Sequence, residues 1–154
     1  MALSLEGNKM PELAVKERIT NFKEVRLGFD EETAQKEAAR CLQCKIPQCQ
    51  KGCPIHNNIP GFIAKIKEHD YDGALAVLRQ TSAYPSVCSR VCAQEQQCEG
   101  HCVLGKRGDA VGIGALERFA AEYGKEPEIS IKTAADDQRV AVVGSGPAGM
   151  AAAD

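Results

Sequence analysis

The amino-acid sequence predicts a mainly α-helical domain with two cysteine-rich loops, followed by the first strand, turn and helix of a truncated Rossmann-like α/β domain. Three observations support this fold class. Apolar residues recur at helical spacing, eight cysteines fall into two compact groups, and a β-branched run precedes a glycine-rich turn. We therefore expect a helical domain at residues 1–126 with an N-terminal lead at 1–30, a linker at 127–138, and the start of a nucleotide-binding domain at 139–154.

The composition is that of a globular protein and argues against several functional classes. The 154 residues are 44% hydrophobic and include no tryptophan, so the core is expected to be mainly aliphatic. The net charge of -2, from 19 basic and 21 acidic residues, provides no global field for nucleic acid or an anionic membrane. No segment has the pattern of a signal peptide or a membrane span. We therefore expect a cytoplasmic protein that binds neither nucleic acid nor a membrane.

Two helices are predicted in the N-terminal part of the chain. The first is indicated by apolar residues at helical spacing, namely Val15, Ile19 and Phe22. Asp30 is suited to cap the second, because a short carboxylate accepts hydrogen bonds from the first turn of a helix. The apolar face of this second helix comprises Ala34, Ala38 and Cys41. Cys41 is therefore expected near a helix end.

Three further helices are predicted from apolar residues spaced by three and four positions. The members of the first set are Ile59, Phe62, Ile63 and Ile66, and those of the second are Tyr71, Ala74, Leu75 and Leu78. The third set comprises Ile113, Leu116, Phe119, Ala120 and Tyr123. The cysteine-rich stretches at 41–60 and 88–102 lie between these helices and are expected to be loops.

The eight cysteines indicate metal binding or redox chemistry, because a reducing compartment does not maintain structural disulfides. The first group has the spacing C-x2-C-x4-C-x3-C and is followed by a proline; its members are Cys41, Cys44, Cys49 and Cys53. The second has the spacing C-x3-C-x5-C-x3-C; its members are Cys88, Cys92, Cys98 and Cys102. Zinc sites usually pair two close ligands with two distant ones. The compact groups instead favour two iron-sulfur clusters, with structural zinc, disulfides and free thiols as alternatives.

The spacing also predicts that the two groups exchange ligands. In bacterial ferredoxins three close cysteines bind one cluster and the fourth, before a proline, binds the other. Short loops bring three thiolates to one face of a cluster, whereas the remaining corner is reached most easily from a distant segment. By this reasoning Cys41, Cys44 and Cys49 hold one cluster, Cys53 crosses to the other, and a residue of the second group crosses back.

The C-terminal part of the sequence predicts a nucleotide-binding turn. Residues 139–143 form a β-branched run typical of a buried parallel strand, and G-x-G-x-x-G follows directly. The expected cofactor-binding residues are Gly144, Gly146, Pro147, Ala148 and Gly149, which allow close approach of a pyrophosphate to a helix N-terminus. No complete nucleotide-binding unit fits after this turn, so we expect the chain to be part of a longer protein. The motif alone does not distinguish FAD from NAD(P).

From about Arg40 to Asp154 the sequence resembles a known family, the small subunit of bacterial glutamate synthase. It is also similar to the large subunit of NADH-dependent ferredoxin:NADP oxidoreductase and to the N-terminal domain of dihydropyrimidine dehydrogenase. The segments that carry the resemblance are CLQC at 41–44, CQKGCP at 49–54, IPGFI at 59–63, RVC at 90–92, CEGHC at 98–102 and IGALER at 113–118.

The resemblance implies a specific set of ligands for two [4Fe-4S] clusters. Cluster one is held by Cys41, Cys44, Cys49 and Cys102. Cluster two is held by Cys53, Cys92 and Cys98 with a non-cysteine fourth ligand, which the resemblance places at Glu117. Without the resemblance, Glu117 is interpreted as a surface carboxylate and Cys88 as the fourth ligand; with it, Cys88 becomes a buried free cysteine.

Weaker candidates surround the cysteines. His56 and His101 lie beside expected ligands and are candidates to tune a cluster, although loop histidines are more often solvated. The basic residues near the loops are expected to offset the negative clusters, to contact an acidic partner, or to be solvated; they are Lys45, Lys51, Arg90, Lys106 and Arg107. No acid-base pair or nucleophile is apparent in the sequence.

The resemblance implies electron transfer in an NAD(P)H-oxidising flavoprotein. A hydride would reach FAD, and single electrons would pass through the two clusters to a partner. In glutamate biosynthesis that partner is the FMN-containing large subunit of glutamate synthase; the rest of the flavoprotein chain is the other expected contact. Two alternatives remain: a subunit of an electron-bifurcating ferredoxin:NADP transhydrogenase, and, from another class, a zinc-stabilised interaction module.

Overall fold

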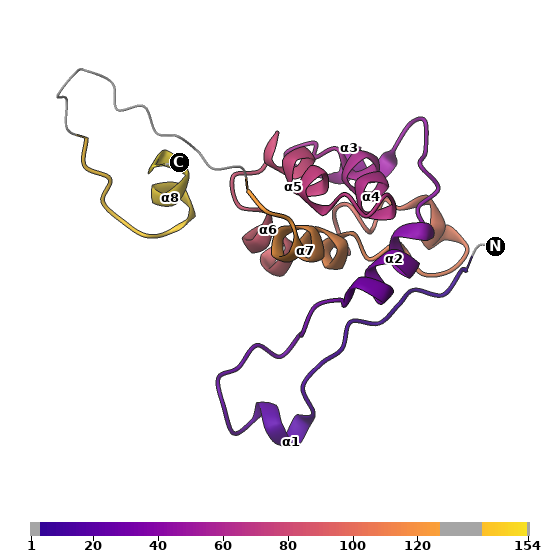
Figure 1. Ribbon diagram of the computed structural model, residues 1–154, viewed down its shortest axis with the longest axis horizontal. Coiled ribbons are helices and arrows are strands. Elements are labelled where there is room, and N and C mark those ends of the chain that lie inside the picture. Colours follow the sequence, from indigo (N-terminus) through magenta and orange to yellow (C-terminus); the bar gives the residue numbers. More distant parts are fainter. Residues whose placement is uncertain (1–3, 127–139, 154) are drawn as a thin grey trace.

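Helix α7 (Ile113–Tyr123) forms the centre of the fold in a computed structural model that describes residues 4–126 and 140–153. It packs against α4 (Ile59–Lys67), α5 (Tyr71–Arg79), α6 (Pro85–Val91) and α2 (Glu31–Ala39), as Figure 1 shows. Short helical segments complete this part: α1 (Val15–Arg18), α3 (Gln48–Gly52) and the 3-10 helix η1 (Val103–Lys106). The last helix, α8, spans Pro147–Ala153. The described residues contain no β-strand, which confirms the mainly helical prediction.

The core is aliphatic with two buried phenylalanines, as the composition predicts. Its largest fully buried apolar side chains are Phe62, Phe119, Ile59, Ile63, Ile66, Leu78 and Leu116. They come from α4, α5 and α7, so the helical spacing correctly identified these three helices and their inward faces. Tyr71 packs edge-on against Phe119, with ring centroids 5.1 Å apart.

Side-chain caps fix the starts of three helices. Asp30 accepts a hydrogen bond from the backbone N–H of Thr33, which confirms it as the N-cap of α2. Asn58 and Asp70 cap α4 and α5 in the same way, each accepting from the N–H three residues later. The Asn58 cap also sets the end of the first cysteine-rich segment, because α4 begins directly after it.

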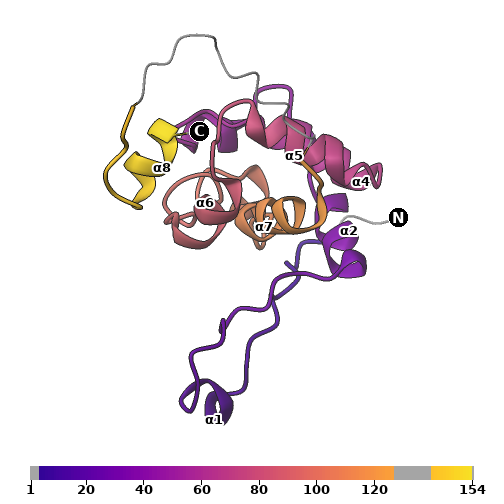
Figure 2. The same cartoon turned by 60° about the vertical axis from the view of Figure 1, so that its left-hand side comes forward.

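The N-terminal lead does not form the helix predicted from Val15, Ile19 and Phe22. Helix α1 has only four residues, and Ile19 and Phe22 are exposed by 76% and 109%. The lead instead runs away from the helices and returns, with α1 at its tip, in both Figure 1 and Figure 2. An isolated antiparallel bridge between Glu12 and Arg26 joins its two arms. The prediction failed because apolar spacing favours a helix only when another surface covers that face.

The other differences concern α6 and the predicted strand. Cys88 lies within α6 rather than in a loop, because Pro85 starts a helix that the sequence analysis did not predict.

The strand expected at 139–143 is not formed by residues 140–143, since a strand requires hydrogen bonds from a neighbouring strand. Residue 139 lies outside the described residues. The linker expected at 127–138 also lies outside them.

The glycine-rich turn takes the form expected before a helix. Gly144 has a φ of 115°, and α8 begins at Pro147, which confirms a turn followed by a helix. A side chain at Gly149 would collide with the carbonyl oxygen of Gly144, so the turn requires a glycine there. In the described residues no helix has the length and hydrophobicity needed to cross a membrane.

Candidate metal centre

Four thiols line a first cavity, which we call cavity one. They belong to Cys41, Cys44, Cys49 and Cys102. The rest of the wall is mostly apolar and includes Ile59, Ile63 and Leu104, which are buried. Three neighbouring cysteines and one from the second group are therefore brought together, in the grouping that the resemblance implies for cluster one.

The local backbone explains how three of these thiols meet. Cys41 follows α2 directly, and its N–H donates to the carbonyl oxygen of Ala38. Gln43 then adopts a φ of 49°, a left-handed conformation that reverses the chain before Cys44. Cys49 lies in α3, whose first turn follows Pro47. A helix end, a tight reversal and a short helix thus bring three nearby residues to the same cavity.

A second cavity, cavity two, is lined by the remaining cysteines and by one carboxylate. These residues are Cys53, Cys88, Cys92, Cys98 and Glu117. Ile59 and Ile113 line both cavities. The two cavities are therefore adjacent, and Cys53 and Cys102 have each crossed from their sequence group to the other group's cavity.

A glycine explains this exchange. Gly52 lies between Cys49 and Cys53, and a Cβ there would be 2.5 Å from His101 Nδ1 and 2.8 Å from the carbonyl oxygen of Gln97. The end of α3 therefore packs directly on the segment between Cys98 and Cys102. One of the two contacting segments carries Cys49 and Cys53, and the other carries Cys98 and Cys102. Cys49 and Cys102 face cavity one, whereas Cys53 and Cys98 face cavity two.

Burial makes three of the cavity thiols weaker acids than usual in the metal-free chain. Burial raises the pKa of Cys49 and of Cys92 to about 11, and that of Cys98 to about 12. A thiol binds a metal in its thiolate form, so metal binding would release these protons. The positive charge of the metal would offset the free-energy cost of burying the thiolate charge.

Within the described residues no three Cys, His, Asp or Glu side chains lie close enough to hold a single metal ion.

Glu117 lies in the middle of α7 and faces cavity two. It is half-buried, and burial raises its pKa to about 7. A carboxylate in this position is destabilised unless a cation or a proton accompanies it, so its surroundings suit a metal ligand. Cys88 lines the same cavity and is half-buried rather than buried, with its sulfur 3.7 Å from the hydroxyl of Ser82.

A buried ion pair supports cavity one. Arg40 and Glu37, exposed by 2% and 0%, form a 2.5 Å contact between Nη1 and Oε1. Arg40 also donates to the carbonyl oxygens of Asp109 and Ala110, and Glu37 accepts from the N–H groups of Gly112 and Asn8. The pair therefore joins the residue before Cys41 to the segment that connects Cys102 with α7.

The sequence analysis did not single out this pair. One signal was available, because Glu37 lies three residues after Ala34 and four before Cys41, on the predicted apolar face of α2. A charged residue on such a face needs a buried partner. Arg118 is a second buried charge, with 5% exposure, and it donates to the carbonyl oxygen of Arg26 in the N-terminal lead.

The weaker candidates are placed differently. His101 lies in an open basin next to Cys102, where its Nδ1 is 2.6 Å from the carbonyl oxygen of Gln97. His56 is exposed and has a φ of 52°. Arg90 forms ion pairs with Glu24 and Glu122, so its charge is balanced within the chain.

The predicted nucleotide-binding residues form the turn before α8 and the first residues of that helix; they are Gly144, Gly146, Pro147, Ala148 and Gly149. Nucleotide binding there remains a prediction.

Comparison with known proteins supports the cysteine pattern. Residues 18–129 match the family described as dihydropyrimidine dehydrogenase domain II, 4Fe-4S cluster. The chain is 41% identical to "Putative oxidoreductase AegA" and 40% identical to "Putative oxidoreductase UacF", both of Escherichia coli strain K12, over 92% of its length. It is also 40% identical, over 99% of its length, to the small chain of NADPH glutamate synthase of the same strain. It spans only 22%, 23% and 33% of these three relatives.

Proposed function

The chain belongs to the dihydropyrimidine dehydrogenase domain II, 4Fe-4S cluster family, and on this premise we propose that it holds two [4Fe-4S] clusters and transfers electrons. Clusters of this type, when bound, accept and release single electrons at potentials set by their ligands and surroundings. The domain would serve an NAD(P)H-dependent flavoprotein, in which FAD converts hydride transfer into one-electron steps.

The division of the thiols between two cavities is the observation that carries this proposal. In cavity one the proposed ligands are Cys41, Cys44, Cys49 and Cys102; in cavity two they are Cys53, Cys92, Cys98 and Glu117. Thiolates suit iron because they are soft donors that stabilise both of its oxidation states. The side chains of Ile59 and Ile113 border both cavities. This arrangement favours two neighbouring redox centres.

Iron and acid-labile sulfide analysis of anaerobically purified protein tests the proposal. We expect about eight of each per chain and a brown absorbance that bleaches with dithionite. A zinc-stabilised interaction module, the competing function from another class, would be colourless and contain zinc without sulfide. That result would overturn the electron-transfer proposal.

The fourth ligand of cavity two has its own test. Replacing Cys88 with Ala should leave the iron content at about eight, whereas replacing Glu117 with Ala should reduce it towards four. The reverse pattern would assign Cys88 as the ligand. Glu122→Ala is the matched control, because Glu122 lies on the same helix and pairs with Arg90 and Arg118 rather than facing a cavity.

For the complete protein we propose the reaction of the glutamate synthase small chain: NADPH reduces FAD, and electrons pass through the domain to the FMN of a large subunit. The 40% identity over 99% of the chain supports this choice. Glutamate formation from 2-oxoglutarate and glutamine, with the full-length protein, NADPH and a glutamate synthase large subunit, tests it. If no glutamate forms but NADPH reduces a ferredoxin, the transhydrogenase alternative replaces it.

A further inference from the structure

The first turn of α7 is capped by side chains from outside the helix. Its N-cap residue is Gly112, which has no side chain to accept a hydrogen bond. The first N–H groups of a helix find no partner inside it, so they need acceptors from elsewhere. Glu37, in α2, accepts from the N–H of Gly112 at 2.8 Å. Glu99, in the second cysteine segment, accepts from the N–H of Gly114 at 3.0 Å.

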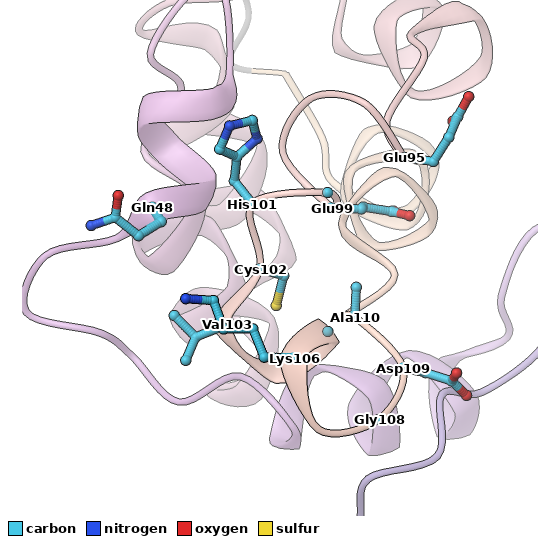
Figure 3. A pocket seen from close by; sticks show the side chains of 12 residues that line it. Gln48, Glu95, Glu99, His101, Cys102, Val103, Lys106, Gly108, Asp109 and Ala110 are labelled. Carbon is cyan, nitrogen blue, oxygen red and sulfur yellow. The ribbon is translucent and has the colours of Figure 1, made fainter.

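Glu99 is half-buried and is held at both its backbone and its side chain. Its backbone N–H donates to the carbonyl oxygen of Gln94 at 2.9 Å, while its carboxylate contacts the helix. Burial raises the pKa of this carboxyl, and hydrogen bonds from the N–H groups of Gly114 and Ile113 oppose that rise. In Figure 3 the side chain of Glu99 lies over the coil of α7, whereas that of Glu95, in the same segment, points away from it. A negative charge thus meets the positive end of the helix.

This contact joins two ligands proposed for the same cluster. Cys98 directly precedes Glu99 in the chain, and Glu117 lies on α7 three residues after Gly114. The side chains of Cys98 and Glu117 both line cavity two. The hydrogen bond therefore lies one residue from the first ligand and one helical turn from the second, and it connects the two chain segments that carry them.

Cavity one depends on α7 in a different way. Its four thiols all lie outside this helix, which contributes only the apolar side chain of Ile113 to the wall. The segment after Cys102 is also held separately, because Arg40 donates to the carbonyl oxygens of Asp109 and Ala110. Displacement of α7 relative to the second cysteine segment would therefore move a ligand of cavity two and no ligand of cavity one.

We propose that Glu99 is a positioning residue for the cluster of cavity two: its carboxylate fixes the first turn of α7 to the second cysteine segment and so sets the place of Glu117 relative to Cys98. The proposal rests on the proposed function, because it concerns the geometry of the same site. The potential of an iron-sulfur cluster depends on its ligands and on the contacts that orient them. Loss of the Glu99 carboxylate should therefore alter the cluster of cavity two and leave that of cavity one unchanged.

The test is an anaerobic redox titration of the chain with its clusters assembled, followed by electron paramagnetic resonance. Cys98→Ala and Cys49→Ala assign the signals, because each should leave only the cluster of the other cavity. In Glu99→Ala we expect the signal and the midpoint potential of the cavity two cluster to shift, and those of the cavity one cluster to stay at their parent values. Loss of the cavity two cluster alone, with about four irons remaining, would support the same assignment. An equal change in both clusters, or no change in either, would overturn it.

A conservative variant and a matched control attribute the effect to the hydrogen bond. Glu99→Gln keeps a side-chain oxygen that can accept from the N–H of Gly114, so the potential of the cavity two cluster should return most of the way to the parent value. Glu95→Ala is the control, since it removes the same side chain at an exposed position of the same segment, and it should change neither cluster. A Gln variant as altered as Glu99→Ala, or an equal change in Glu95→Ala, would refute the role of this contact.

Iron, acid-labile sulfide and urea unfolding are measured on every preparation. If Glu99→Ala does not fold, Glu99→Asp decides, because it keeps the charge but shortens the side chain by one methylene; a change confined to the cavity two cluster is expected, and two unaltered clusters would refute the proposal. Reduced stability with both clusters unaltered would show a structural role only and leave the proposed function standing. Absence of iron from the parent chain would refute the proposed function itself.

Discussion

Cavity one and cavity two use the same donor chemistry but are supported in different ways. Behind cavity one, the fully buried pair of Glu37 and Arg40 holds the chain next to Cys41 and the segment after Cys102. Behind cavity two, Arg118 and Arg90 join α7 and α6 to the N-terminal lead through Glu24, which is about half exposed. When a buried ion pair is broken, water does not solvate the charge that remains, so the loss of stability is large. The charges of an exposed pair are already solvated and screened, so breaking that pair costs little. The comparison therefore predicts a rigid first site and a second site whose support is more easily loosened.

The largest expected effect comes from removing the two exchanged cysteines. Cys53→Ala should remove about four of the eight irons per chain and leave the cluster of cavity one. Cys102→Ala should also remove about four but leave the other cluster. Electron paramagnetic resonance of the reduced proteins checks this, because Cys53→Ala should match Cys98→Ala, and Cys102→Ala should match Cys49→Ala. Matching by sequence group instead would contradict the division between cavities.

The second effect concerns the buried pair. Glu37→Ala leaves the Arg40 charge buried without its partner, so the free energy of unfolding should fall by roughly 3–5 kcal/mol. Urea unfolding followed by circular dichroism measures it. Glu32→Ala on the exposed face of the same helix, where Glu32 pairs with Lys36, is the control and should change little. If both variants unfold alike, the pair does not provide the support that we assign to it.

The third effect is a pH dependence expected at cavity two, whose lining includes a carboxylate whereas that of cavity one does not. Burial raises the pKa of Glu117 to about 7 in the metal-free folded chain, above its usual value of 4.5. The folded state then binds more protons than the unfolded state between these values, so stability should fall as pH rises from about 4.5 to about 7, by at most about 3 kcal/mol. Unfolding of metal-free protein across this range measures the fall, and Glu117→Gln should flatten it. An equally steep profile in the variant would show that other groups are responsible.

The smallest effect is expected from the lead. The hydrogen bond from Arg90 lowers the pKa of Glu24, and Arg118 contributes further. Glu24→Gln should therefore lower the free energy of unfolding by less than about 1 kcal/mol, because this side chain is half exposed. Hydrogen exchange should be faster at residues 11–27, whereas Glu68→Gln, which affects only an exposed pair on α4, should leave these residues unchanged. Unaltered exchange in Glu24→Gln would show that the ion pairs do not hold the lead.

Local pattern was sufficient for the helices that form the core. The spacing of apolar residues identified α4, α5 and α7, since each buries one face against the others, and Asp30 identified the start of α2. The same pattern failed for α1, where no other surface covers Ile19 or Phe22, and it did not indicate α6. The spacing of apolar residues shows that a helix has an apolar face that it could bury. Whether that face is buried depends on whether the rest of the fold covers it.

The sequence by itself determined the chemistry of this protein: eight cysteines in compact groups, a family-specific motif set, and the expectation that the groups exchange ligands. The family resemblance implied which thiols group together and that Glu117 joins the second group, but the spacing alone left the crossing residue of the second group open; only the tertiary structure showed the two cavities and the buried ion pair that supports one of them. The physical reason is distance along the chain. Spacing constrains residues a few positions apart, whereas Cys49 and Cys102 meet because α3 packs on the second cysteine segment at Gly52, a contact that depends on the whole fold.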